Sequence, residues 1–437
     1  TGREAYPRAV GSSASGGTDG SPGRAPRRLR ARVLSPLSAD GQSVYVNATA
    51  SGDPERLLSD LQNLGLAGGE VAGGVVSGRL PIGQLQDAAQ ASGLRGMVPA
   101  YAQTHVGSVG SEADTAHAVP EARSEAGTDG SGQKVCVLSD SYNQDDLAET
   151  TASGDIQSGD LPGPGNPIGN TTPVDVVEEG GDSNTDEGRA MLQLIHDIAP
   201  GAELGFHTAF GGLAVFAQGI GDLADAGCTV IVDDIRYNIE PFYQDGPVSK
   251  AVNEVVESEG VPYFTSAGND GQNSYEAPFR DSGEPGILDS SSVAHDFDPL
   301  SGTDTRQKIA LEAGGRFRIF AFQWTDPSSV VEGSKGADTD IDVALVNDAG
   351  TVVASSSSDN IATGIPLESI DYTNDTGSSQ VLNLTVEKFA GPDPEEIKYV
   401  YSGSGYDIQE YDTLGPTVYG HPVAERAVAV AAAPFFN

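Results

Sequence analysis

Between residues 133 and 266 short apolar runs alternate with amphipathic segments, and this alternation constrains the fold more than any other feature of the chain. Four runs predict strands, at 134–139, 202–207, 228–233 and 261–266. Three segments with apolar residues at helical spacing predict helices, at 187–198, 213–226 and 246–259. Such alternation is typical of an α/β fold, a parallel sheet with helices on both faces. Right-handed crossovers would bring the carboxyl ends of the strands, and any site built on them, to one edge.

The segments around this core have other textures. Residues 1–29 are rich in Gly, Ser, Pro and Arg and predict a disordered tail, whereas 30–105 predict a small α+β domain of split β-α-β type. A polar linker is expected over 106–132, so the first part of the core spans 133–284. From 285 to 412 the apolar period changes to two, which predicts an inserted all-β sandwich. Residues 413–437 return to the texture of the core.

Composition narrows the classes of function. The formal net charge is -39, from 63 acidic and 24 basic residues, which repels nucleic acid and anionic lipid and is typical of proteins that work in concentrated salt. We therefore expect a halophilic source and no nucleic-acid partner. Hydrophobic residues make up 38% of the chain, which favours packed domains over disorder. No apolar run is long enough for a membrane span, and no signal segment opens the chain. Because the first residue is Thr1 and not Met, we expect a processed or truncated product.

The two cysteines, Cys136 and Cys228, lie in or at the start of apolar runs of strand type. Buried free thiols are favoured over a disulfide or a metal pair, because free cysteine is among the most buried residue types.

Acidic and amide side chains lie where the predicted strands end and one helix begins. Asp140 follows the strand KVCVLS, Glu187 opens the helix at 187–198, Asn269 follows the strand at 261–266, and Asp233 and Asp234 close CTVIV. Acyl transfer needs a nucleophile, a base, a group that orients the base, and a donor for the oxyanion. Each residue alone also fits a structural role, a turn former for Asp140 and Asn269 or a strand cap for either aspartate. Their combination at one sheet edge favours a catalytic site.

Three segments, in order, resemble the subtilisin-like serine peptidases: KVCVLSDSYN (134–143), TDEGRAMLQLIHDIAPGAEL (185–204) and PYFTSAGNDG (262–271). The resemblance implies a secreted or cell-surface endopeptidase with Asp140 as the catalytic aspartate and Asn269 in the oxyanion hole. Glu187 stands where this family has its histidine. His196 lies about 180° around the helix from Glu187, so we expect a structural role for it.

The related sedolisins use a Ser, Glu, Asp set and an oxyanion aspartate, which makes a glutamate base chemically reasonable. Their two acids lie four residues apart on one helix, whereas here that position is Met191. A helix N-terminus lowers the pKa of a carboxylate, and burial beside another carboxylate raises it. We therefore predict that Glu187, Asp140 and one of Asp233 or Asp234 form a proton-sharing acidic site.

The resemblance also covers the flanking domains. Residues 30–105 resemble the inhibitory propeptide of the family, and the insertion resembles the bacterial pre-peptidase C-terminal sandwich. Asp338, Asp340 and Asp342 in the insertion could collect calcium, but strand alternation favours a solvated acidic face, so no cofactor is required. Asn47, Asn170, Asn374 and Asn383 stand in glycosylation sequons.

The predicted function is that of a serine-type endopeptidase precursor acting on peptides or proteins, with its own propeptide as inhibitor. No Gly-Thr-Ser segment follows residue 271, so the nucleophilic serine is expected beyond residue 437 and the chain by itself should be inactive. The alternative is a non-catalytic relative that binds a surface polymer or protein through its β-sandwich. A nucleotide-binding α/β domain is disfavoured, because no glycine-rich phosphate loop follows KVCVLS.

Overall fold

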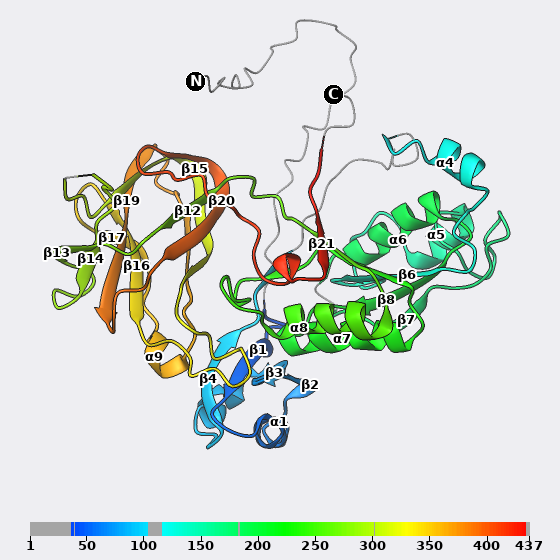
Figure 1. Ribbon diagram of the computed structural model, residues 1–437, viewed down its shortest axis with the longest axis horizontal. Coiled ribbons are helices and arrows are strands. Elements are labelled where there is room, and N and C mark those ends of the chain that lie inside the picture. Colours follow the sequence, from blue (N-terminus) through cyan, green and yellow to red (C-terminus); the bar gives the residue numbers. More distant parts are fainter. Residues whose placement is uncertain (1–35, 39, 104–115, 182–183, 301, 434–437) are drawn as a thin grey trace, which may run out of the picture.

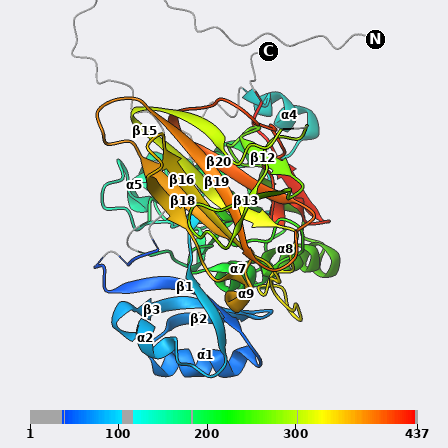
Figure 2. The same ribbon diagram turned by 90° about the vertical axis from the view of Figure 1, so that its left-hand side faces the viewer.

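The computed structural model describes residues 36–38, 40–103, 116–181, 184–300 and 302–433. Three parts can be distinguished in Figure 1: a small α+β domain at the bottom, an α/β domain on the right and an antiparallel β domain on the left. In the view turned by 90° the α+β domain again lies below the other two (Figure 2). None of the helices in the described ranges is long and apolar enough to cross a membrane.

The N-terminal α+β domain is a four-stranded antiparallel sheet, in the order β2-β3-β1-β4, packed against helix α1. Asp53 caps α1 by accepting a hydrogen bond from Glu55 N, and Leu57 and Leu61 bury the apolar stripe of the helix. The run ARVLSP (31–36) predicts a further strand, but all of it except Pro36 lies outside the described residues. The elements are β1 (Ser43–Ala50), α1 (Pro54–Asn63), β2 (Ala67–Ala72), β3 (Val75–Pro81), the 3₁₀ turn η1 (Ile82–Gln84), α2 (Leu85–Ala88) and β4 (Leu94–Pro99).

The α/β domain is built on a six-stranded parallel sheet in the order β21-β11-β9-β6-β8-β7. Its predicted strands and helices are all present, with ends within about two residues of the expected ones except where α8 passes into a π-helical turn. The strands are β6 (Lys134–Ser139), β7 (Asp175–Glu178), β8 (Glu203–Thr208), β9 (Val230–Asp233), β11 (Tyr263–Ser266) and β21 (Ala427–Val430). The helices are α4 (Val119–Ala126), α5 (Ala152–Ser158), α6 (Glu187–Ile198), α7 (Leu213–Asp225), α8 (Pro247–Glu254) with η2 (Val255–Glu259), and η3 (His421–Val423).

Helices cover both faces of this sheet, as the alternation predicted. Along β6, Val137 packs with Leu192 of α6, whereas Cys136 and Leu138 pack with the apolar residues of α7 and α8 on the opposite face. Figure 1 shows α6 above the sheet and α7 and α8 below it. Helix α4 lies inside the segment expected to be a plain linker, and α5 and β7 were not predicted.

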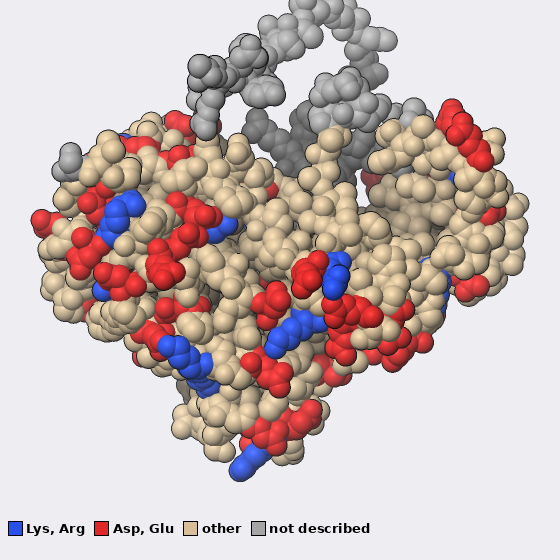
Figure 3. All heavy atoms as spheres, viewed as in Figure 1, with Lys and Arg blue, Asp and Glu red and all other residues tan. Residues whose placement is uncertain are grey.

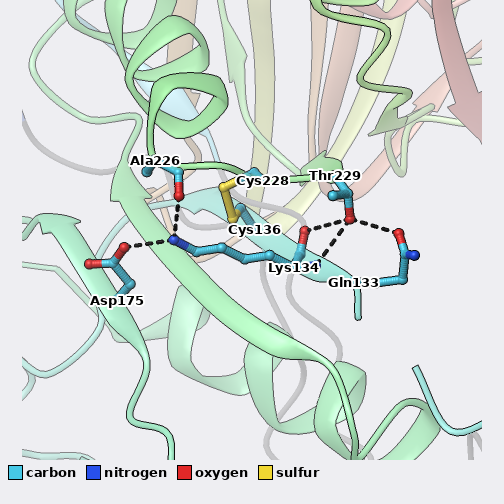
Figure 4. Close-up of a disulfide and its surroundings, with 7 residues drawn as sticks. All are labelled: Gln133, Lys134, Cys136, Asp175, Ala226, Cys228 and Thr229. Carbon is cyan, nitrogen blue, oxygen red and sulfur yellow. Dashed lines mark hydrogen bonds and ion pairs between the residues drawn. A yellow bond between two sulfur atoms is a disulfide. The ribbon is translucent and has the colours of Figure 1, made fainter. Parts of the chain in front are cut away.

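Cys136 and Cys228 form a disulfide, so the prediction of free thiols was wrong. Cys136 lies in β6 and Cys228 just before the neighbouring strand β9, which brings the two residues together although they are 92 positions apart. Lys134 and Thr229 tie the same two segments by hydrogen bonds, Lys134 Nζ to Ala226 O at 2.7 Å and Lys134 N to Thr229 Oγ1 at 3.0 Å (Figure 4). Because disulfides persist mainly in oxidising compartments, this bond agrees with a protein that works outside the cytoplasm.

The antiparallel β domain lies in the chain between β11 and β21, so it is an insertion into the parallel sheet. Its nine strands form one hydrogen-bonded network around the 18-residue strand β15, with a core that includes Phe317, Phe322 and Trp324. The elements are β12 (Ser274–Ala277), β13 (Asp281–Pro285), β14 (Val293–His295), β15 (Gln307–Trp324), β16 (Asp340–Asn347), β17 (Val352–Ser356), α9 (Asn360–Thr363), β18 (Glu368–Thr373), β19 (Gln380–Ala390) and β20 (Ile397–Ile408).

Acidic side chains are spread over all three domains on the face drawn in Figure 3, with basic residues few between them. The sequons are mostly inside the fold: Asn47, Asn374 and Asn383 are buried. Asn170 is half-buried, with its Nδ2 3.3 Å from His196 Nε2. A folded chain therefore offers at most Asn170 for glycosylation.

Candidate active site

Asp140 directly follows β6 and is fully buried. Its carboxylate accepts hydrogen bonds from Ser141 N (2.6 Å), Thr185 N (2.6 Å), Thr185 Oγ1 (2.6 Å) and Glu187 N (2.9 Å). Burial raises the pKa of Asp140, although the hydrogen bonds from Thr185, Ser141 and Glu187 act in the opposite direction. The contacts join the end of β6 to the first turn of α6, and they fix where that helix begins.

Glu187 is the first residue of α6 and is buried. Asp234 follows β9, the strand next to β6, and accepts a hydrogen bond from Ser139 Oγ at 3.1 Å. The pKa of Asp234 lies well above its ordinary value, because of burial and then because of the charge of Glu187 and a hydrogen bond with it. Asp140 adds to this rise. Three carboxyl groups, Asp140, Glu187 and Asp234, therefore gather at one edge of the sheet, and the charges of the other two add to the raised pKa of Asp234.

Asp233, the other aspartate of the pair, faces away from this group. Successive residues at the end of a strand point to opposite faces, so only one of the two can lie beside Glu187. Asp233 Oδ1 accepts hydrogen bonds from Ile235 N and Thr265 Oγ1, both at 3.0 Å, and lies 3.2 Å from His421 Nε2.

A second buried cluster forms around His421, which the sequence analysis missed. His421 Nδ1 lies 2.8 Å from Glu240 Oε2, and both side chains are buried, as is Asp233 on the other side of the ring. Burial lowers the pKa of His421, but Glu240 and Asp233 outweigh it and raise the pKa to about 10. His421 and Asp233 are far apart in the sequence, and no motif links them, so only the fold could reveal the cluster.

Asn269 follows β11 in an exposed loop, where Gly268 takes a left-handed conformation with φ 78°. Because β11 lies next to β9, Asn269 is on the same sheet edge as Asp140 and Asp234. In the described part of the chain, its side chain makes no hydrogen bond to the three carboxyl groups. The next residue, Asp270, is buried and forms an ion pair of 2.6 Å with Arg236.

Asp186 is a positioning residue that sequence reasoning missed. It adopts φ 56°, a left-handed conformation that is uncommon for a residue other than glycine. Its carboxylate accepts from Ser141 Oγ (2.8 Å), Gln144 N (2.6 Å) and Asp145 N (3.1 Å) and pairs with Arg189 at 2.8 Å. The strained residue thus holds the loop after Asp140 against α6. Its place in the chain, just before a predicted helix, was the only signal available.

The surroundings of Gly188, the second residue of α6, leave no room for a side chain. A Cβ atom at this position would overlap the Phe206 ring and lie 2.8 Å from Ser141 O. A larger residue would therefore push α6, and Glu187 with it, away from Asp140.

His196 lies in the same helix but does not join the acidic group. It is buried, and Asn170 is the residue beside its Nε2. Burial lowers the pKa of His196.

The aspartates considered for calcium do not converge. Asp338 lies outside β16 in a loop and pairs with Lys335, whereas Asp340 and Asp342 lie in β16 and are 7% and 8% exposed. The expected solvated strand face is therefore wrong for these two, because neighbouring strands and loops cover them. Burial, followed by the charge of Asp340, raises the pKa of Asp342 to about 7. No group of three or more acidic, His or Cys side chains in the described ranges could hold a metal ion.

Comparisons with known proteins add little. A scan against models of protein families finds no match, and a search of curated proteins finds no relative. Three solved structures resemble parts of the chain. The CspB protease of Clostridium perfringens is 13% identical, with 74% of each chain covered and a TM-score of 0.33. A mutant of the epidermin leader peptide processing serine protease (EpiP) of Staphylococcus aureus is 12% identical over 53% of this chain and 62% of that one, with a TM-score of 0.31. Fervidolysin of Fervidobacterium pennivorans, a keratinolytic enzyme related to subtilisin, is 11% identical over 92% and 81%, with a TM-score of 0.29. Likenesses this weak carry no argument about the fold or activity of this chain.

Proposed function

We propose that this chain belongs to a subtilisin-like serine endopeptidase that uses Glu187 in place of the histidine base. The observation that carries the proposal is the meeting of three carboxyl groups at one sheet edge, where Glu187 N donates to Asp140 Oδ1 at 2.9 Å and Asp234 follows the adjacent strand. The raised pKa of Asp234 agrees with this geometry. Titratable groups whose environments shift their pKa values strongly are concentrated at functional sites.

In the proposed reaction a serine hydroxyl attacks the scissile carbonyl while its proton passes to the Glu187 carboxylate. Glu187 then gives this proton to the leaving amine, which departs as the acyl-enzyme forms. A water molecule next loses a proton to Glu187 and attacks the ester, and Glu187 returns that proton to the departing serine oxygen, which restores the hydroxyl and the free carboxylate. Asp140, which accepts the Glu187 N–H, orients the base, and Asp234 shares a proton with it. Asn269 is the proposed oxyanion donor. The serine itself is not assigned to any residue of this chain.

The N-terminal domain is the proposed inhibitor of this site. Its last described strand, β5 (Ala102–Gln103), pairs antiparallel with β10 (Arg236–Tyr237), which begins two residues after Asp234. An extended peptide substrate bound beside Asp234 would use the same backbone groups of β10, so the two would compete. This arrangement supports a precursor whose N-terminal domain blocks the substrate strand until it is removed.

The test is a Glu187→Gln substitution in the full gene product that carries this chain, assayed on casein in concentrated salt. The change keeps the size of the side chain and removes the base, so we expect at least a hundredfold loss of kcat. Glu203→Gln is the matched control, because Glu203 is exposed at the opposite edge of the same sheet, and it should leave activity unchanged. Undiminished activity of Glu187→Gln would refute the glutamate base.

The pH dependence provides an independent check. A proton-sharing acidic site predicts an acid-shifted optimum, whereas a rate governed by a single group near pH 7 would count against it. The alternative function, a non-catalytic protein that binds a surface polymer or protein, predicts no hydrolysis by the full gene product at any pH.

A further inference from the structure

The inserted β domain contacts the α/β domain at the loop that follows β10, the proposed substrate strand. Gln323 of β15 is buried, and its amide makes three hydrogen bonds to the backbone that follows β10. Its Nε2 donates to Asn238 O and Glu240 O, both at 2.9 Å, and its Oε1 accepts from Phe242 N at 3.0 Å. A single side chain of the insertion thus satisfies three backbone groups of a loop that lacks regular structure of its own.

Strand β15 of the insertion also contacts Arg236, the first residue of β10. The Arg236 guanidinium lies over two aromatic rings, 5.4 Å from the centroid of Phe320 in β15 and 5.1 Å from that of Tyr419. All three side chains are buried. Such contacts hold the planar guanidinium by cation–π attraction and restrict how it can turn.

Arg236 in turn reaches the loop of the proposed oxyanion donor. Its Nη2 lies 2.6 Å from Asp270 Oδ2, one residue after Asn269, and both charged groups are buried. Thr417 supports the far side of the loop by donating its hydroxyl to Gly271 O at 2.8 Å. The position of the Asn269 loop is therefore linked, through a buried ion pair, to a ring supplied by the insertion.

We propose that the inserted β domain sets the geometry of the active-site edge, with Phe320, Gln323 and Arg236 as positioning residues for β10 and for the Asn269 loop. The part of this inference that concerns catalysis rests on the proposed function, whereas the mechanical link does not. The insertion would then be required for turnover.

The mechanical link can be tested on the present chain by amide hydrogen exchange. Phe320→Leu and Gln323→Leu should accelerate exchange by about tenfold or more in residues 234–242, and Phe320→Leu should also do so in 266–273. Phe317→Leu is the matched control, because Phe317 is a buried ring of the same strand that packs inside the insertion against Tyr401 and Tyr406. It should accelerate exchange only within the β domain. Unchanged exchange at 234–242 and 266–273, or an equal effect of Phe317→Leu, would overturn the link.

The catalytic consequence is measured in the full gene product. Phe320→Leu should lower kcat by about tenfold to a hundredfold, because a displaced donor weakens binding of the oxyanion more than binding of the substrate. Asn269→Ala removes the donor entirely, so its loss of kcat is the largest that displacement of the donor could cause. Loss of kcat in Asn269→Ala without any loss in Phe320→Leu would overturn the positioning role and leave the proposed function intact. No hydrolysis by the unsubstituted gene product would overturn the proposed function, and the exchange experiment would still decide the link.

Discussion

Helix α7 of the α/β domain is capped by residues of the N-terminal domain, and removing this cap should destabilise the protein measurably. The residue at the N-cap of α7 is Gly212, which has no side chain to cap the helix. Instead Asn47 Oδ1 accepts from Leu213 N at 2.9 Å, and Ser77 Oγ accepts from Ala214 N at 3.1 Å. Ser77 also donates to Asn47 Oδ1 at 2.8 Å, so the two caps form one buried network.

The size of the effect follows from what is left unpaired. An Asn47→Ala, Ser77→Ala double variant removes both acceptors and leaves two helix N–H groups buried under the N-terminal sheet. Loss of a cap costs about 0.5–2 kcal/mol, and a buried donor without a partner costs about 1–3 kcal/mol. Because the two residues share one network, their effects will not simply add, and we expect a loss of about 2–4 kcal/mol in the free energy of unfolding.

Urea denaturation of the chain in concentrated salt, followed by circular dichroism at 222 nm, measures this loss. Asn47→Asp should lose less than Asn47→Ala, because it keeps an acceptor at the positive end of α7. Asn63→Ala is the matched control at an exposed position at the end of α1, and it should change stability by no more than about 0.5 kcal/mol. A double variant as stable as this control would refute the idea that the N-terminal domain caps α7.

Three further predictions concern buried cysteines and charges. Replacing Cys136 and Cys228 by alanine should lower the free energy of unfolding by about 3–5 kcal/mol, because the disulfide closes a loop with a sequence separation of 92. Thermal unfolding of the native chain with and without a reductant would show the same loss, and equal midpoints would contradict a stabilising disulfide. The pKa of His421 in the folded state is about 10, above the ordinary 6.5, so its contribution to stability should be complete below pH 6.5 and lost as the pH rises through 10. His421→Gln should remove this pH dependence of the free energy of unfolding, as measured by denaturation curves at a series of pH values. Asp234 has a raised pKa in the folded state, so the stability that its protonated form contributes is lost as the pH rises. Asp234→Asn should therefore exceed the native chain in free energy of unfolding by at least about 1 kcal/mol at pH 8, with a difference that shrinks toward pH 4. A native chain more stable than this variant at pH 8 would be inconsistent with the acidic pair.

The local parts of the α/β domain could be predicted from the sequence because each depends on neighbours in the chain. The run at Lys134–Ser139 and the helix at Glu187–Ile198 were placed to the residue, since apolar spacing and helix-start signals are local. The parallel topology then determined that Asp140, Asp234 and Asn269 share one edge. The sequence could not decide whether Asp233 or Asp234 lies beside Glu187. Strand alternation predicts that the two side chains point to opposite faces of the sheet, but it does not predict which face α6 covers.

Features that depend on distant partners escaped prediction. Cys136 gave no sign of Cys228 as its partner, because a disulfide is decided by the distance between two strands and not by either run. Strand β2, with the sequence AGGEVA, has weak strand propensity and forms through its pairing with β3. Asp342 was expected to be solvated, because periodicity shows that residues share a face but not whether another segment covers it.

The electrostatics of the edge support the proposal that the acidic group is a catalytic site and not a structural ion cluster. A carboxylate kept for stability is normally paired with a cation, as Asp186 is with Arg189 at 2.8 Å. Asp234 instead lies beside a second carboxylate, and burial and this charge raise its pKa. Such an arrangement reduces the stability of the folded state at neutral pH, and nothing in the packing of β9 against β6 requires it. Proteins tolerate costs of this kind mainly where chemistry needs them, and the Asp140 contacts that hold the start of α6 in place give the same edge the rigidity that such chemistry requires.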